Sequence, residues 1–200
     1  MGFTLFEPFS PAGIPASRML LVAECEQLPI QQARRGDAAA WDAVFARYQL
    51  PLYAYVHQLV RDEQDSLDIV QETFVSAFRH LATLRDDRKF ASWLFSIAHQ
   101  KSIQKWRGRD KQASAFDEVA AEPLEFEDGP DELLIRDEQK AAVLALLDQL
   151  PPPQRSVLLL HYLEDFPLDE IARITDAQLG TVKSRLHYAK RALKKLLEAP

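Results

Sequence analysis

The segment of the sequence most suggestive of chemistry is a basic stretch near the C-terminus, from Leu168 to Leu197. It starts with apolar residues at helical spacing, breaks at Asp176, and continues with six lysines and arginines and no acid before Glu198. Two helices joined by a short turn, the second one basic, form a helix-turn-helix, whose second helix enters the major groove of DNA. The segment therefore predicts a short helix from Leu168 and a longer DNA-binding helix from about Leu179.

Basic side chains of this second helix would neutralise phosphates, and the polar residues early in it are placed to reach base edges. Thr181 is expected to cap the helix or to bind a phosphate at its N-terminus. The candidate DNA contacts are Thr181, Lys183, Ser184, Arg185, His187, Tyr188 and Arg191. A solvated amphipathic helix is the alternative, and charge alone favours that alternative.

Composition excludes several classes of function. The chain of 200 residues has a formal net charge of -6, so any DNA-binding charge must be segregated along the chain. Its single cysteine, Cys25, rules out an internal disulfide, and the five histidines lack metal-ligand spacing, so we expect no metal and no cofactor. No apolar run is long enough for a membrane span and the N-terminus lacks the pattern of a secretory signal, which makes the cytoplasm the expected location.

Apolar residues recur at helical spacing in both halves of the chain, which predicts an all-α fold of two small helical bundles joined by an acidic flexible linker. The expected organisation is a flexible leader over 1–28, a first bundle over 29–111, the linker over 112–132 and a second bundle over 133–200. Within the first bundle we expect Asp37 to cap a helix, Pro51 to open a new helix in its first turn, and Ser92 to cap the last helix. For Trp93 we expect a place in the core rather than at a binding surface.

Five stretches resemble the bacterial sigma factors of the sigma-70 family, specifically the extracytoplasmic-function (ECF) group. In the first half these are RGDAAAWDAVFARY, DSLDIVQETFVSAF and FASWLFSIAHQ, similar to the family's second region. In the second half LDQLPPPQRSVLLLHYLEDFPLDEIA and GTVKSRLHYAKRALKKLL are similar to its fourth region. The resemblance covers nearly the whole chain after the leader, with both regions in the family's order.

The resemblance implies a promoter-specificity subunit of RNA polymerase, not an enzyme, that responds to an envelope or environmental signal. The partners that it implies are core RNA polymerase, promoter DNA and an anti-sigma factor. The first bundle would bind the polymerase clamp helices and melt the −10 element, and the second would read the −35 element. The acids of the linker would mimic nucleic-acid charge in the polymerase channels.

Residues for these roles follow from the resemblance together with the chemistry that each role needs. Polymerase binding would use Asp65, Asp68, Gln71 and Glu72. Melting DNA needs a pocket for an extruded base and a basic track for the backbone. The candidates for that role are Arg85, Arg88, Lys89, His99, Gln100, Lys101, Lys105, Trp106 and Arg107.

The sequence departs from the family pattern at several positions. Asp176 stands where glycine is common in the turn, a position at which aspartate tolerates left-handed backbone better than most residues. Tyr188 and the pair His99-Gln100 replace more usual residues, so the promoter preference is expected to be unusual. The polymerase-binding helix is one acid short, at Ser66, and a regulatory kinase acting on Ser66 or the nearby Thr73 would restore the charge. The simpler alternative, that the remaining acids suffice, is the one we favour.

Two other classes of function compete with this interpretation. A free-standing helix-turn-helix regulator would bind an operator as a dimer, and would need a dimerisation helix and a ligand-binding or phosphoacceptor domain, neither of which is found. An enzyme ranks third, because the sequence contains no recognisable nucleophile, catalytic carboxylate pair, phosphate loop or metal cluster.

Overall fold

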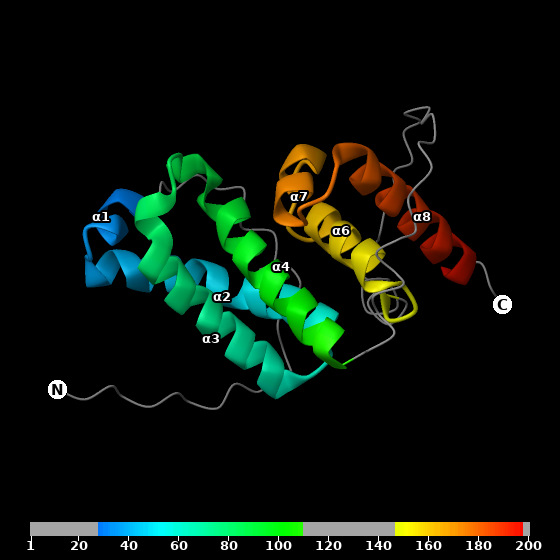
Figure 1. The fold of residues 1–200 in the computed structure, drawn as a ribbon, viewed down its shortest axis with the longest axis horizontal. Coiled ribbons are helices and arrows are strands. Elements are labelled where there is room, and N and C mark those ends of the chain that lie inside the picture. The colour runs from blue at the N-terminus through cyan, green and yellow to red at the C-terminus, as the bar shows by residue number, and fades with distance from the viewer. Residues whose placement is uncertain (1–27, 110–146, 198–200) are drawn as a thin grey trace.

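The computed structural model describes residues 28–109 and 147–197, and every regular element within these two ranges is a helix. The prediction of an all-α fold is therefore confirmed. The leader up to residue 27, the acidic linker and the first part of the expected second bundle, up to residue 146, lie outside the described residues. Figure 1 shows the two helical bundles side by side, with the N-terminal half at one end of the molecule and the C-terminal half at the other.

The first bundle contains four α-helices and two short 3-10 turns among the described residues. The helices are α1 (Ile30–Arg34), α2 (Ala38–Val60), α3 (Glu63–His80) and α4 (Phe90–Arg109), and the turns are η2 (Leu81–Thr83) and η3 (Asp87–Lys89). The helices α2, α3 and α4 contact one another pairwise and enclose the bundle's core. The largest buried side chains in that core are Val44, Leu52, Tyr55, Leu81, Leu94 and Phe95.

Local signals explain where these helices begin. Asp37 caps α2, because its Oδ1 accepts a hydrogen bond of 2.9 Å from the backbone of Ala40, as expected from the sequence. Gly36, before it, takes the left-handed backbone (φ 87°) that ends α1. Asp62 caps α3 in the same way, through a 2.8 Å bond from the backbone of Asp65.

Two expectations about helix starts in the first bundle are wrong. Pro51 does not open a helix but lies inside α2, which runs through it without a break. A proline in a helix interior removes a hydrogen bond, yet buried residues on both sides of it, Tyr48 and Leu52, hold the helix against the core. Ser92 lies inside α4 and donates to the carbonyl of Lys89 instead of capping the helix.

The second bundle is built from α6 (Pro152–Tyr162), α7 (Leu168–Ile174) and α8 (Leu179–Leu197). The bounds of α7 and α8 confirm the expected pair of helices with the second starting at Leu179. The turn between them carries Asp176 in the left-handed conformation (φ 50°), where an aspartate was expected to replace glycine. Val182, Leu186, Ala189 and Leu193 form the buried face of α8.

The two bundles pack against each other. Helix α4 contacts α7 and α2 contacts α6, and buried residues of both bundles belong to one continuous hydrophobic cluster. The rings of Phe95 on α4 and Phe166, in the loop before α7, meet edge to face with their centroids 5.2 Å apart. In this arrangement, which we call the closed arrangement, the helix-turn-helix leans on the last helix of the first bundle (Figure 1).

Candidate nucleic-acid interface and partner groove

Helix α8 presents its candidate DNA contacts unequally. His187, Tyr188 and Arg191 are exposed, whereas Thr181, Lys183 and Arg185 are half-buried. Ser184 is buried, and its hydroxyl donates to the carbonyl of Thr181 over 3.0 Å, so it faces the bundle rather than solvent. Thr181 is the third residue of α8 and not its cap, which corrects the expected capping role.

The apolar face of α8 is buried, which argues against the alternative that α8 is a solvated helix. Its buried residues pack on α6 and α7, with contacts between α8 and both helices. Helix α8 is therefore the second helix of a packed helix-turn-helix. Its exposed cations are Arg191, Lys194 and Lys195, whereas Arg185 is half-buried and its charge acts on His99 of the first bundle. A basic helix held in this way is the arrangement that enters a major groove.

The loop before α4 carries three of the candidate cations for strand opening. Arg85 and Arg88 are exposed, and Arg88 makes a bidentate pair with Asp86, through Nε and Nη2, at 3.0 Å each. The hydrogen bonds from Arg88 lower the pKa of the Asp86 carboxyl. Lys89 forms an ion pair with Glu170 of α7, across the seam between the bundles.

Two further candidate cations on α4 are paired with candidate polymerase-binding acids on α3. Lys101 Nζ lies 2.9 Å from Glu72 Oε2, and Lys105 Nζ lies 2.9 Å from Asp65 Oδ1. The polymerase-binding and strand-opening residues predicted from the sequence are therefore adjacent in space. Gln100 and Arg107 on the same helix are exposed, and Trp106 is half-buried.

The structure places His99 in the core of the first bundle rather than on a DNA-binding surface. Its side chain is 7 % exposed, and Nδ1 lies 2.7 Å from the hydroxyl of Tyr55. Burial, together with the charges of Arg185 and Arg107, lowers the pKa of His99 to about 4. A neutral, buried imidazole is not available to DNA in the closed arrangement. Trp93 is half-buried and packs against Phe90, as expected of a core residue.

The two candidate phosphorylation sites are also buried. Ser66 and Thr73 are both 0 % exposed. The hydroxyl of Ser66 donates to the carbonyl of Asp62, and that of Thr73 donates to the carbonyl of Ile69 over 2.7 Å. A kinase could reach neither hydroxyl without local unfolding of α3, so the geometry lends no support to the phosphorylation hypothesis.

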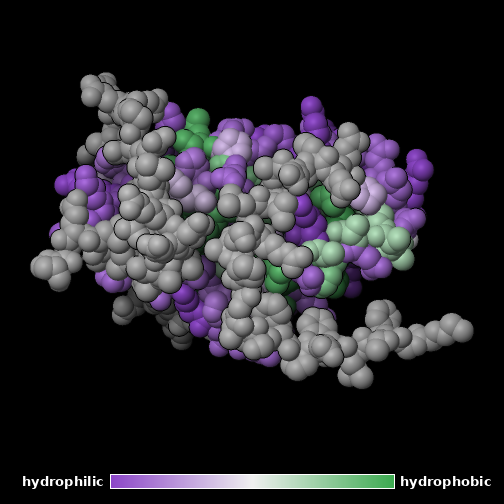
Figure 2. All heavy atoms as spheres, turned by 180° about the vertical axis from the view of Figure 1, so that it is seen from behind, coloured by the Kyte–Doolittle hydropathy of each residue, from purple (hydrophilic) through white to green (hydrophobic). Residues whose placement is uncertain are grey.

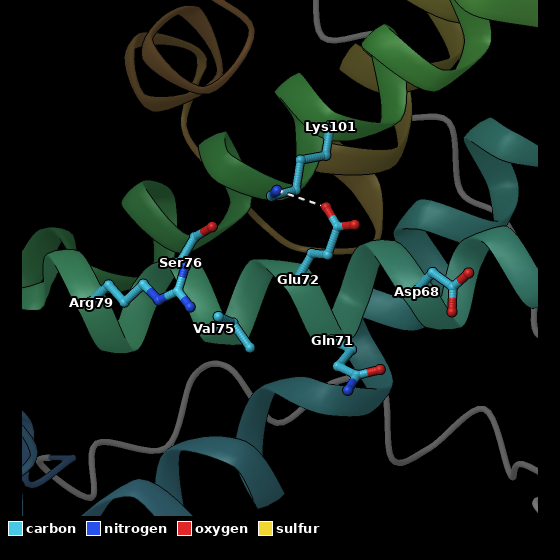
Figure 3. Close-up of a pocket in the computed structure, with 7 residues that line it drawn as sticks. All are labelled: Asp68, Gln71, Glu72, Val75, Ser76, Arg79 and Lys101. Carbon is cyan, nitrogen blue, oxygen red and sulfur yellow. Dashed lines mark hydrogen bonds and ion pairs between the residues drawn. The ribbon is translucent and has the colours of Figure 1, made fainter.

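A groove of about 420 Å³ runs along α3 and is closed on one side by α4 (Figure 3). Three of the four candidate polymerase-binding residues, Asp68, Gln71 and Glu72, line it. The rest of its lining is Val75, Ser76, Arg79 and Lys101. In Figure 3 the ion pair between Lys101 and Glu72 spans the groove between the two helices.

Arg155, which no sequence pattern singled out, binds four backbone carbonyls. It donates through Nε to Leu147 (2.8 Å) and through Nη2 to Asp148 and Leu150 (3.0 Å each). Its Nη1 donates across the seam to the carbonyl of Gln58 on α2 at 2.9 Å. Burial, together with the charge of Arg61, lowers its pKa to about 10, so it keeps its charge at neutral pH.

The reason for this arrangement can be read in the sequence afterwards. In a helix, the carbonyls of residues 147 and 148 would accept bonds from residues 151 and 152, which are both proline and carry no N–H. The guanidinium of Arg155 donates to both carbonyls, and the carbonyl of Leu147 also accepts from the N–H of Leu150. A triple proline followed by an arginine is the signal that could have revealed it.

Among residues 28–109 and 147–197 no group of histidine, cysteine and carboxylate side chains could hold a metal ion. Within the same ranges no helix combines the length and the apolar character that crossing a membrane requires.

Comparison with known protein families gives two matches that follow one another along the chain. Residues 44–112 match the family described as Sigma-70 region 2, and residues 140–193 match Sigma-70, region 4. The first range spans most of α2 and all of α3 and α4, and the second spans the helix-turn-helix.

Curated relatives match almost the full length of the chain. The RNA polymerase sigma-H factor of Pseudomonas aeruginosa is 31% identical over 188 residues, which cover 90% of this chain and 97% of that protein. The ECF RNA polymerase sigma-E factor of Escherichia coli K12 is 32% identical over 178 residues, which cover 84% and 92% of the two chains.

Two solved structures share the fold. CnrH in complex with the cytosolic domain of CnrY has a TM-score of 0.62 and 24% identity, over 92% of this chain and 98% of that one. The sigma factor RpoE of Bartonella quintana, in complex with the anti-sigma factor NepR, has a TM-score of 0.59 and 22% identity, over 80% and 97%. The two family matches follow one another along the chain, and the curated relatives match almost its full length. The chain belongs to the ECF group of the sigma-70 family, and it is an alternative RNA polymerase sigma factor that acts in promoter recognition and transcription initiation.

Proposed function

We propose that this chain is a dissociable subunit that contacts core polymerase through α3 and promoter DNA at two points, the loop and helix over Thr83–Arg109 and the helix α8. The observation that carries the proposal is the pairing of Lys101 and Lys105 with Glu72 and Asp65. An acidic row for a protein partner thus borders a basic row for DNA. The proposed units remain 29–111 and 133–200, joined by the linker 112–132.

The polymerase-binding surface is the groove along α3. Asp68, Gln71 and Glu72 are exposed there and would meet basic side chains of the polymerase. Val75 and Phe78, on the same helix, are 43% and 61% exposed and offer apolar area to a protein partner. Figure 2 shows the opposite face of the molecule, where apolar side chains are also visible toward the end formed by the first bundle.

The −10 element would be opened along the loop before α4 and along α4 itself. Arg85, Arg88 and Lys89 would bind the backbone of the separated strand, and Lys101, Lys105 and Arg107 would continue the track. Gln100 is exposed and offers both a donor and an acceptor to a base edge, and half-buried Trp106 offers an aromatic face for stacking. His99 would take part only indirectly, by holding Tyr55.

The −35 element would be read by α8 in the major groove. His187, Tyr188 and Arg191 would reach the DNA most directly, because they are the exposed members of the candidate set. Lys183 and Arg185, both half-buried, would become more accessible if the bundles separate. Ser184 would support the helix from within through its bond to Thr181.

The closed arrangement would limit promoter binding by the free chain. Lys89 is paired with Glu170, and α7 covers part of α4. Polymerase would separate the bundles and expose both DNA-binding faces. Tight and specific promoter binding by the chain alone, unchanged by core polymerase, would contradict this part of the proposal.

Further parts of the proposed role concern partners and place of action. An anti-sigma protein is a proposed partner, by analogy with the Bartonella quintana sigma factor bound to NepR. The chain is proposed to be a binding factor and not an enzyme, and to act in the cytoplasm, where polymerase and DNA are found.

The deciding experiment is transcription in vitro from a mixed promoter library, with core polymerase, in the presence and absence of the full chain. We expect a new set of transcripts that share upstream elements only when the chain is present. If the chain instead shifts duplex DNA as a dimer and gives no transcripts with core polymerase, it is a free-standing regulator.

A further inference from the structure

Glu164 is a buried carboxyl group at the seam between the two bundles. It is 4% exposed and lies in the loop between α6 and α7. Its Oε2 has no hydrogen-bond partner, and it forms no ion pair with any residue in 28–109 or 147–197. A buried carboxylate without a partner is costly, so such a group either stays protonated or destabilises the packing around it.

The groups that face Glu164 come from both bundles. Its charge raises the pKa of Tyr48 and Tyr55, which lie on α2 of the first bundle, although burial is the larger cause for both. Phe166, which follows Glu164 by two residues in the same loop, packs on Phe95 of α4. Arg47 also acts on Tyr48. Glu164 therefore sits where the closed arrangement must be broken for the bundles to separate.

The other charged groups at the seam do not neutralise it. Asp165, the next residue, adds a like charge, and on the α4 side His99 is neutral and bonded to Tyr55. Lys89 of the first bundle and Arg173 of α7 are both already paired with Glu170. Burial and the charge of Asp165 raise the pKa of Glu164 to about 7.

We propose that Glu164 is a proton-sensitive latch of the closed arrangement: the neutral carboxyl is accommodated between the bundles, whereas the carboxylate drives them apart. Protonation would favour the closed form, and ionisation would favour the open form. The chain alone would then carry a pH-dependent opening equilibrium, in addition to any opening driven by polymerase.

The sign and size of the effect follow from linkage. A carboxyl with a pKa of about 7 when closed and its usual 4.5 when open binds a proton more tightly in the closed form. Ionisation of Glu164 leaves the opening constant almost unchanged well below pH 4.5. Well above pH 7 it multiplies the opening constant by about 300. His99, whose pKa is lowered partly by Arg185 of the other bundle, works in the opposite direction below its usual pKa of 6.5.

The experiment measures opening by energy transfer between two dyes on the full chain, without polymerase or DNA. In a Cys25→Ser background, Glu63→Cys on α3 and Gln178→Cys before α8 provide exposed labelling positions in different bundles. The opening constant is followed from pH 4.5 to pH 8 with Glu164 and with Glu164→Gln, which is neutral throughout. The quotient of the two constants cancels the contribution of His99.

We expect this quotient to rise by about two orders of magnitude across this range. A quotient that does not change with pH, or a chain that stays open or stays closed at every pH with both side chains, overturns the latch. Asp165→Asn gives a second test that does not alter Glu164: removal of the like charge should move the midpoint of opening to lower pH. Asparagine tolerates the left-handed backbone at this position (φ 53°). Because no polymerase is present, failure of the latch leaves the proposed function standing.

Discussion

Lys89 and Glu170 lie 81 residues apart in the sequence and form an ion pair across the seam between the bundles. Burial alone would raise the pKa of Glu170, but the hydrogen bond and the charge of Lys89, together with the charge of Arg173, outweigh it, so its pKa lies below the usual value. The carboxylate of Glu170 is thus paired with Lys89, a cation that is predicted from the sequence to bind promoter DNA. If Lys89 binds promoter DNA as the sequence predicts, a phosphate would have to displace Glu170 from it.

Replacing Glu170 with glutamine should therefore release Lys89 for DNA. We expect Glu170→Gln to strengthen binding of a fluorescent single-stranded oligonucleotide by the free chain roughly fivefold at low salt, equivalent to about 1 kcal/mol. Fluorescence anisotropy measures the affinity. Asp169→Asn is the matched control, because Asp169 is exposed and pairs with Arg173, which Glu170 also contacts. Equal gains in both variants would argue that net charge, not the pair, controls binding.

The groove along α3 predicts a loss of affinity for core polymerase. Asp68→Asn removes an exposed charge from the groove while keeping the shape of the side chain. We expect the dissociation constant for core polymerase to rise about three- to tenfold, as for other exposed charges at an interface rim, equivalent to about 1 kcal/mol. Competition against a labelled sigma factor measures it. Glu63→Gln, at the start of α3 and outside the groove, should leave the constant unchanged, and a similar loss there would contradict a localised site.

Arg191 is an exposed cation on α8 and is expected to bind a promoter phosphate. Removing one phosphate contact reduces the slope of log affinity against log salt by about 0.9. We expect Arg191→Ala in the holoenzyme to show this change on a duplex selected from the promoter library, with little effect on sequence preference. Arg173→Ala, on the first helix of the helix-turn-helix, is the control. An altered preferred sequence with an unchanged slope would instead assign Arg191 to a base edge.

Sequence patterns predicted the elements of this fold well where local signals act. The bounds of α7 and α8 and the cap at Asp37 depend on residues within a few positions of each other, so they could be predicted from the sequence. Pro51 shows the limit of local rules, because the packing of α2 against α3 and α4 outweighs the loss of one helical hydrogen bond.

The candidate sites show the same limit at longer range. Helical periodicity could not reveal that His99 points toward Tyr55, because that contact depends on how α2 and α4 pack, 44 residues apart in the sequence. Ser66 looked like a gap in an acidic row, and only the fold reveals that its hydroxyl is buried. The seam itself, with Glu164 in it, depends on contacts between distant helices, which one sequence does not specify.

Arg155 should contribute strongly to stability, because its guanidinium donates to three carbonyls of the segment before the prolines and to one carbonyl of α2 across the seam. We expect Arg155→Lys to lower the free energy of unfolding by about 2 kcal/mol or more, since lysine cannot reproduce four bonds in a planar fork. Urea unfolding followed by circular dichroism measures the loss. Arg173→Lys, at an exposed position, should cost little. A midpoint for Arg155→Lys equal to that of the unchanged chain would show that water replaces the guanidinium.

The lowered pKa of His99 predicts that the free energy of unfolding decreases as the solution becomes acidic. Its pKa is about 4 in the folded chain and 6.5 when exposed, so the folded state disfavours the proton. The stability that neutral His99 allows is complete above pH 6.5 and is lost as the pH falls toward 4, by up to about 3 kcal/mol. Glutamine at this position can keep a hydrogen bond to Tyr55 but does not titrate.

The free energy of unfolding of the unchanged chain should therefore fall more steeply between pH 6.5 and pH 4 than that of His99→Gln. Urea unfolding at several pH values gives both curves, and their difference removes the contribution of every other titrating group, including Glu164. Parallel curves would mean that the imidazole takes up its proton inside the folded chain, and that burial against Tyr55 does not hold it neutral.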